Sequence, residues 1–118
     1  MPDEMKSRGD SLVALCSVAA VEPDAPIQAV VAGVAYAVFN LEGRFYVTQD
    51  LCTHGPGSLA DGFVMDDEIE CPFHQGRFHI PSGRATVAPC TEALRVWTVH
   101  EVDGTLYIDP DERSGAKG

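Results

Sequence analysis

The sequence predicts an all-β protein built from short antiparallel strands, arranged as a barrel or sandwich. Two observations predict this class. Runs rich in Val and aromatic residues recur along the chain, and Gly, Asn and Asp separate them. No segment has the apolar spacing of a long amphipathic helix. The length of 118 residues fits one domain, and a hydrophobic content of 45% supplies enough apolar side chains for a core.

Six runs are predicted to be strands because they are rich in β-branched or aromatic residues and are bounded by turn signals. In chain order they span residues 12–18, 28–31, 34–39, 44–48, 95–102 and 105–109. The segment Asn40-Leu41-Glu42-Gly43 predicts one hairpin turn, and Asp103-Gly104 predicts a second. Residues 95–102 alternate apolar and polar side chains, which is typical of one continuous half-buried strand.

The region from about residue 50 to residue 90 does not follow this pattern. It contains many of the glycines and prolines, and we expect an inserted subdomain whose order depends on something other than a large core. Residues 1–10 and 110–118 are polar, and we expect both to be terminal tails. The folded domain is therefore predicted to span residues 11–109.

The chain is strongly acidic, with 8 Lys and Arg against 18 Asp and Glu and a formal net charge of −10. Such a charge repels nucleic-acid phosphates and anionic membranes, so we expect neither as a partner. A partner with a basic patch is favoured. No apolar run reaches the roughly 20 residues of a membrane-spanning helix. The apolar stretch after Lys6 and Arg8 is similar to a signal peptide, but we interpret it as the first strand of a cytoplasmic protein.

Two short motifs carry the chemistry: C-x-H at residues 52–54 and C-x-x-H at residues 71–74. Glycines flank both motifs, and glycine allows the backbone to approach a bound group closely. The four side chains could hold one Zn²⁺ in a zinc-stabilised binding module. They could instead hold a [2Fe–2S] cluster, with two cysteines on one iron and two histidines on the other. The paired motifs argue against unrelated core residues. The candidate ligands are Cys52, His54, Cys71 and His74.

At these residues the chain resembles the Rieske iron–sulfur family. The resemblance covers residues 11–109 and includes Asp61-Gly62 between the motifs, Gly83 after them, and Pro89 at the position of a proline that covers the cluster. Within the family the chain is most similar to the small ferredoxins of bacterial ring-hydroxylating oxygenase systems. The resemblance implies the Rieske fold, in which a cluster-binding subdomain is inserted into an antiparallel base.

The resemblance also implies one Rieske-type [2Fe–2S] cluster per chain. Cys52 and Cys71 would ligate the inner iron, and His54 and His74 the outer iron near the surface. The chain would then be an electron carrier and not an enzyme. It would pass single electrons from a flavin-containing ferredoxin reductase to the terminal oxygenase that hydroxylates an aromatic compound. We expect a monomer that forms transient complexes. The alternative is the small Rieske subunit of an assimilatory nitrite reductase.

Two departures separate the chain from the respiratory members of that family. Those proteins have a disulfide at the positions of Gly57 and Phe73, so that bond cannot form here. They also have a serine and a tyrosine that donate hydrogen bonds to sulfur, at the positions of Gly76 and Phe78. We therefore expect a low Rieske potential, on the order of −150 mV. Gly76→Ser and Phe78→Tyr are each expected to raise it.

Other chemically reactive residues are assigned smaller roles. We expect Cys16 and Cys90 to be structural, although Cys90 follows the covering proline and so lies near the cluster. His79 and His100 are expected to be ordinary strand residues. The acidic run at residues 66–70 contains no basic residue, and we interpret it as a docking surface for a basic partner in preference to a solvated turn.

Overall fold

We analysed a computed structural model of the chain, which describes residues 12–53, 57–72, 76–88, 90–111 and, as backbone, 114–115. The expected tail at residues 1–10 and most of that at 110–118 lie outside these residues. Strands dominate the described part. Its helical elements are two single 3-10 turns, η1 (Val18–Ala20) and η2 (Leu59–Asp61). The all-β prediction is confirmed, and no helix among the described residues is long and apolar enough to cross a membrane.

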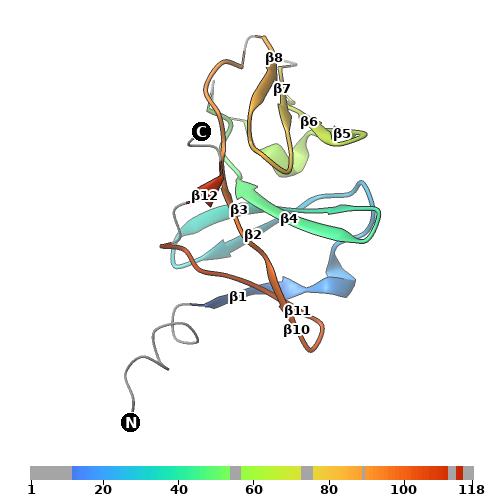
Figure 1. Cartoon of the computed structure of the whole chain (residues 1–118), viewed down its shortest axis with the longest axis vertical. Coiled ribbons are helices and arrows are strands. Elements are labelled where there is room, and N and C mark those ends of the chain that lie inside the picture. The colour runs from blue at the N-terminus through green and yellow to red at the C-terminus, as the bar shows by residue number, and fades with distance from the viewer. Residues whose placement is uncertain (1–11, 54–56, 73–75, 89, 112–113, 116–118) are drawn as a thin grey trace.

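The base of the molecule is formed by two antiparallel sheets (Figure 1). The larger sheet has the order β12-β9-β4-β3-β2. Its strands are β2 (Ile27–Val31), β3 (Val34–Leu41), β4 (Arg44–Gln49), β9 (Arg95–Trp97) and β12 (Ser114–Gly115). The hairpin turns Ala32-Gly33 and Glu42-Gly43 have φ values of 53° and 82°, and of 56° and 91°. Two successive positive φ values match the right-handed twist of the paired strands, so these turns fix the register of β2, β3 and β4.

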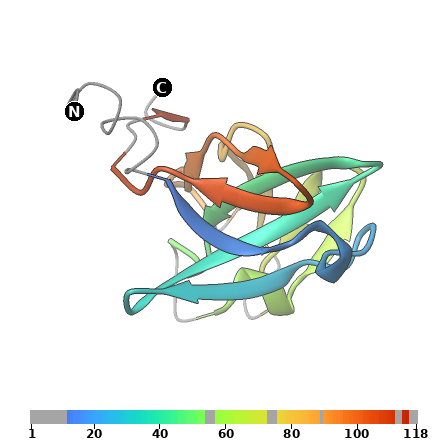
Figure 2. The ribbon, with the colours of Figure 1, turned by 90° about the horizontal axis from the view of Figure 1, so that it is seen from below.

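The smaller base sheet has the order β1-β11-β10. It contains β1 (Val13–Ser17), β10 (His100–Val102) and β11 (Thr105–Ile108), and Asp103-Gly104 forms the predicted turn between the last two. Seen from below, β1 and β11 cross one face of the larger sheet (Figure 2). The first hydrophobic core lies between the two sheets. Its buried members are Val21, Ala29, Tyr36, Val38, Val47, Trp97, Leu106 and Ile108.

The prediction of one continuous strand at residues 95–102 is wrong. The chain pairs with β4 through β9, leaves that sheet, and pairs with β11 through β10. Val96 and Trp97 are adjacent and both buried, which breaks the alternation that a single strand needs. Trp97 packs edge-on against Tyr36, with ring centroids 5.0 Å apart. The C-terminal segment, expected to be a tail, contributes β12, in which Ser114 pairs with Val96.

A third sheet occupies the inserted region and stands above the base (Figure 1). It has the order β5-β6-β7-β8 and contains β5 (Phe63–Met65), β6 (Glu68–Glu70), β7 (Arg77–His79) and β8 (Ala85–Val87). A second hydrophobic core lies under it and reaches the larger base sheet. Its buried members are Ala37, Phe39, Cys52, Leu59, Ile69, Cys71, Phe78, Ile80, Cys90 and Leu94.

Candidate metal centre

Cys52 and Cys71 begin two loops that close in the same way. Leu51 bridges to Ser58, and inside this pair the Cys52 N–H donates to the Gly57 carbonyl at 2.9 Å. Four residues therefore lie between Cys52 and Gly57 in the first loop, and four lie between Cys71 and Gly76 in the second.

The second loop repeats this arrangement at the end of the β6–β7 hairpin. Glu70 pairs with Arg77, and inside this pair the Cys71 N–H donates to the Gly76 carbonyl at 2.8 Å. His54 and His74 belong to the two loops but lie outside the described residues. The structure thus describes the closure of both loops and the cysteine of each.

The two cysteine side chains are buried in one core. Cys52 is 2% exposed and Cys71 is 0% exposed, and both belong to the second hydrophobic core together with Leu59 and Phe78. The topology therefore brings together two thiols that lie nineteen residues apart in the sequence. An apolar surrounding of this kind keeps water away from whatever the sulfur atoms bind.

Asp50, which no sequence motif indicates, anchors the first loop. Its side chain is 3% exposed, and one carboxylate oxygen accepts hydrogen bonds from Gln28 Nε2 at 2.8 Å and Ser58 Oγ at 2.7 Å. The other oxygen accepts one from the Ala60 N–H at 3.0 Å. The loop is thereby tied to β2 and to η2. A buried aspartate with partners this distant in sequence carries no local signature that would reveal it.

Gly76 is a glycine because there is no room for a side chain. A Cβ there would collide with Cys90 Sγ, and it would lie 2.9 Å from both Cys90 N and the Val87 carbonyl oxygen. Two of these atoms belong to the backbone, so the neighbours cannot move aside cheaply. Glycine is therefore required at position 76 for lack of space and not for its backbone conformation, because Gly76 is not among the described glycines with a positive φ.

Cys90 lies beside both candidate ligand sulfurs. It is 4% exposed and shares the second core with Cys52 and Cys71. Burial, followed by the charge of Cys52, a hydrogen bond to Cys52 and the charge of Cys71, raises the pKa of the Cys90 thiol to about 12. The four cysteines, all of them described, form no disulfide with one another. Cys90 was expected to be structural but to lie near the cluster, and the structure places it beside both candidate ligand cysteines.

Two other glycines that carry the resemblance, Gly62 and Gly83, are also constrained by the structure. A Cβ at Gly62 would collide with the Glu70 carbonyl oxygen, immediately before Cys71. Gly83 has a φ of 80°, the left-handed region that favours glycine, and its carbonyl accepts from the Leu94 N–H at 2.7 Å. Pro89 lies outside the described residues.

Three carboxylates of the acidic run at residues 66–70 have partners on the neighbouring strand. Arg77 lies 3.7 Å from Glu68 and 3.6 Å from Glu70, measured between side-chain nitrogen and oxygen atoms. His79 Nε2 lies 3.2 Å from a carboxylate oxygen of Asp67. Arg77 supplies one positive charge to two glutamates, and His79 is charged only when it is protonated, so the run keeps most of its negative charge.

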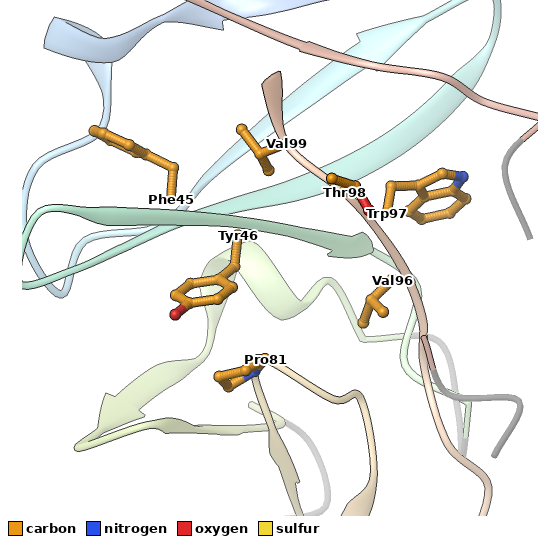
Figure 3. A pocket seen from close by; sticks show the side chains of 7 residues that line it. All are labelled: Phe45, Tyr46, Pro81, Val96, Trp97, Thr98 and Val99. Carbon is orange, nitrogen blue, oxygen red and sulfur yellow. The ribbon is translucent and has the colours of Figure 1, made fainter. Parts of the chain in front are cut away.

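A hollow of about 330 Å³ lies between the base and the third sheet (Figure 3). Tyr46 points toward Pro81 across it, while Phe45, the neighbouring residue on β4, points to the other side of the strand. Its lining residues are Phe45, Tyr46, Pro81, Val96, Trp97, Thr98 and Val99. None of the described cysteines lines it, so it is separate from the candidate metal centre.

The donors that the structure describes fit a cluster that takes two thiolates on one side. Both sulfurs are buried, they start matching loops, and each loop carries one candidate histidine. Among the described residues, no three His, Cys, Asp or Glu side chains are grouped to hold a metal ion.

Comparison with known proteins gives a family match and sequence relatives that agree with each other. The Rieske [2Fe-2S] domain family matches residues 11–98. The ferredoxin component of the naphthalene 1,2-dioxygenase system of Pseudomonas aeruginosa is 44% identical over 79 residues, covering 67% of this chain and 76% of that protein. The ferredoxin component of the p-cumate 2,3-dioxygenase system of Pseudomonas putida is 41% identical over 78 residues, covering 65% of this chain and 66% of that protein.

Solved structures agree with the sequence relatives. The Sphingomonas yanoikuyae B1 ferredoxin superposes with a TM-score of 0.80 at 40% identity, covering 82% of this chain and 96% of that chain. A chain of the complex of reduced oxygenase and oxidized ferredoxin in carbazole 1,9a-dioxygenase has a TM-score of 0.81 at 33% identity, covering 87% and 96%. A structure described as a nitrite reductase small subunit has a TM-score of 0.72 at 21% identity, covering 82% and 96%, which shows a shared fold alone.

Proposed function

The chain belongs to the Rieske [2Fe-2S] family, and on that premise we propose that it is the ferredoxin of a dioxygenase system that acts on an aromatic compound. The observation that carries this proposal is the similarity to ferredoxin components of such systems, at 44% identity for the naphthalene system and 41% for the p-cumate system. Such a component transfers electrons and is not itself the catalytic enzyme.

We propose that Cys52 and Cys71 bind the inner iron of the cluster and that His54 and His74 bind the outer iron. The burial of both cysteines and the matching closure of their loops support the first pair. The position of one histidine in each loop supports the second pair. When bound, the cluster would accept and release one electron.

The rest of the domain holds these ligands in place. Asp50 fixes the first loop to the base, and the β6–β7 hairpin fixes the second. The second hydrophobic core surrounds both sulfurs with apolar side chains such as Phe78 and Leu94. Fixed ligands change little between the oxidised and reduced states, so little reorganisation opposes electron transfer.

We propose two partners for the carrier, a flavin-containing ferredoxin reductase and a terminal oxygenase. The similarity to a chain from a complex of oxygenase and ferredoxin in carbazole 1,9a-dioxygenase supports the second partner. The net charge of −10 favours transient docking to basic surfaces by a monomer.

The cellular location is proposed to be the reducing cytoplasm, because the thiols of Cys16 and Cys90 are free. The working unit is proposed to be residues 11–109, to which β12 adds an edge strand of the larger base sheet.

Electron delivery in a reconstituted system tests the function. The reduced protein is mixed in a stopped-flow instrument with the oxidised terminal oxygenase of a naphthalene dioxygenase, and reoxidation is followed by absorbance. Reoxidation of the protein at a rate of many turnovers per minute, and product formation that depends on the protein, would support the proposal. A protein that stays reduced with several such oxygenases, yet copurifies with a nitrite reductase large subunit, would overturn it.

A further inference from the structure

The sulfur of Cys90 occupies the space that a side chain at Gly76 would take. A Cβ on Gly76 would collide with that sulfur before any other atom. The Cys90 N–H donates to the Val87 carbonyl at 3.2 Å, which fixes the backbone of Cys90 at the end of β8. The thiol is thus held over the end of the second loop, where the resemblance places a serine hydroxyl in respiratory proteins.

The thiol also has a candidate ligand as its neighbour. The side chain of Cys90 is hydrogen-bonded to that of Cys52, and both share a core with Cys71. It is 4% exposed, so water does not compete freely for its proton. A cysteine thiol has one proton to donate.

We propose that Cys90 donates an S–H···S hydrogen bond to the Cys52 sulfur and thereby raises the reduction potential of the cluster. The proposal rests on ligation by Cys52, which belongs to the proposed function. An electron added to the centre makes the ligand sulfur more negative, so a donor to that sulfur stabilises the reduced state more than the oxidised state. The thiol replaces, as a weaker donor, the hydroxyl that Gly76 cannot provide.

Two substitutions that differ by one oxygen atom test the role of the donor. Cys90→Ala removes the donor, and Cys90→Ser replaces it with a stronger one of similar size. The midpoint potential is measured by redox titration followed by circular dichroism. We expect Cys90→Ala to lower the equilibrium constant for reduction two- to tenfold, at most about 59 mV for one electron. We expect Cys90→Ser to raise it above the wild-type value.

Cys16 provides the matched control, because it is a free, partly buried cysteine in the other core. Cys16→Ala and Cys16→Ser are expected to leave the potential unchanged. The proposal is overturned if the Cys90 variants keep full iron and sulfide but share one potential, because packing alone then explains the residue. If Cys90→Ala loses the cluster, the test depends on Cys90→Ser. An unchanged or lower potential in the serine variant, or loss of the cluster from that variant too, also overturns the proposal.

The wild-type protein separates this proposal from the proposed function. Iron and acid-labile sulfide in equal amounts, with the absorption of a [2Fe–2S] centre, support the cluster whatever the Cys90 variants do. A wild-type protein without sulfide would reject the cluster and the role of Cys90 together. A normal cluster with identical potentials in the alanine and serine variants would reject the role of Cys90 alone.

Discussion

The two loops of the metal centre close in the same way but are anchored differently. The first, between Cys52 and Gly57, depends on side-chain hydrogen bonds to the buried carboxylate of Asp50. The second, between Cys71 and Gly76, connects two paired strands and packs against Cys90 without spare volume. The same local geometry is thus stabilised by a polar network in the first loop and by strand pairing and close packing in the second. Substitutions should therefore break the two loops by different routes.

The largest effect is expected from filling the space at Gly76. Gly76→Ala places a methyl group against Cys90 Sγ and two backbone atoms, so the second loop cannot keep its closure. We expect the purified variant to lack most of its iron and sulfide. The same collision applies to Gly76→Ser, so the expected rise in potential from a serine at this position is replaced by loss of the cluster.

Gly104→Ala is the matched control for Gly76. Gly104 lies in a base turn with a φ of 81° and open space around its Cβ position. The substitution should cost about 1–2 kcal/mol of stability through backbone strain and leave the iron content unchanged. A Gly76→Ala protein with full iron and sulfide would contradict the steric account of the second loop.

Asp50→Asn should weaken the first loop with a somewhat smaller effect. The substitution keeps the shape but turns one acceptor oxygen into a donor that faces other donors, so a buried hydrogen bond is lost at a cost of about 1–3 kcal/mol. We expect the cluster to be released to an iron chelator at least about fivefold faster, because 1.4 kcal/mol corresponds to a factor of ten.

Asp109→Asn controls for the loss of a charge. Asp109 also accepts a backbone hydrogen bond, from the Asp111 N–H at 3.0 Å, but this bond is exposed and lies far along the chain from the cluster motifs. Its release rate should match that of the wild type. Equal release rates for the Asp50 and Asp109 variants would show that the polar network does not hold the first loop.

Phe78→Tyr should raise the midpoint potential by a few tens of millivolts. Phe78 is 0% exposed in the core that contains both ligand sulfurs, so a new hydroxyl there must find a buried partner. A bond from that hydroxyl to sulfur is worth at most about 1.5–3 kcal/mol, and only the difference between the two redox states shifts the potential. A crystal structure that shows the bond, with an unchanged potential, would disprove the role of hydrogen bonds.

The smallest effect is expected from the acidic run. Glu68 and Glu70 lie near Arg77, and exposed ion pairs of this kind contribute less than about 1 kcal/mol to stability. Glu68→Gln combined with Glu70→Gln should slow association with the oxygenase less than about threefold at low ionic strength, and not at high ionic strength, because salt screens exposed charges. A tenfold slowing at low ionic strength would instead support the docking interpretation of this run.

The sequence predicted the base better than the metal centre. Val-rich runs and the turns Glu42-Gly43 and Asp103-Gly104 located most base strands, because strand propensity and turn chemistry are local. The break near Thr98 between β9 and β10 was missed, because β9 and β10 pair with strands of two different sheets, and such pairing is a tertiary effect. The short strands of the third sheet were missed for a related reason, since three-residue strands have too few residues to show a period.

At the metal centre, the motifs pointed to the candidate ligands but not to their supports. C-x-H and C-x-x-H are visible in a line of sequence because the spacing of ligands within a tight loop is local. Asp50 and Cys90 are recognised only after folding, because their partners lie on other elements. The ion pairs of the acidic run were not visible in the sequence either, since their cationic partner lies on the neighbouring strand. The docking role of this run stays a prediction.

The ligation of the cluster by two cysteines and two histidines is tested most directly by magnetic resonance on the reduced protein. The protein is purified without oxygen after growth with ¹⁵N-labelled histidine, and electron–nuclear double resonance is recorded alongside iron and sulfide analysis. We predict equal amounts of iron and acid-labile sulfide, at two of each per chain, and couplings from two histidine nitrogens. One zinc without sulfide, or a cluster that shows no histidine nitrogen coupling, would contradict the assignment of Cys52, His54, Cys71 and His74.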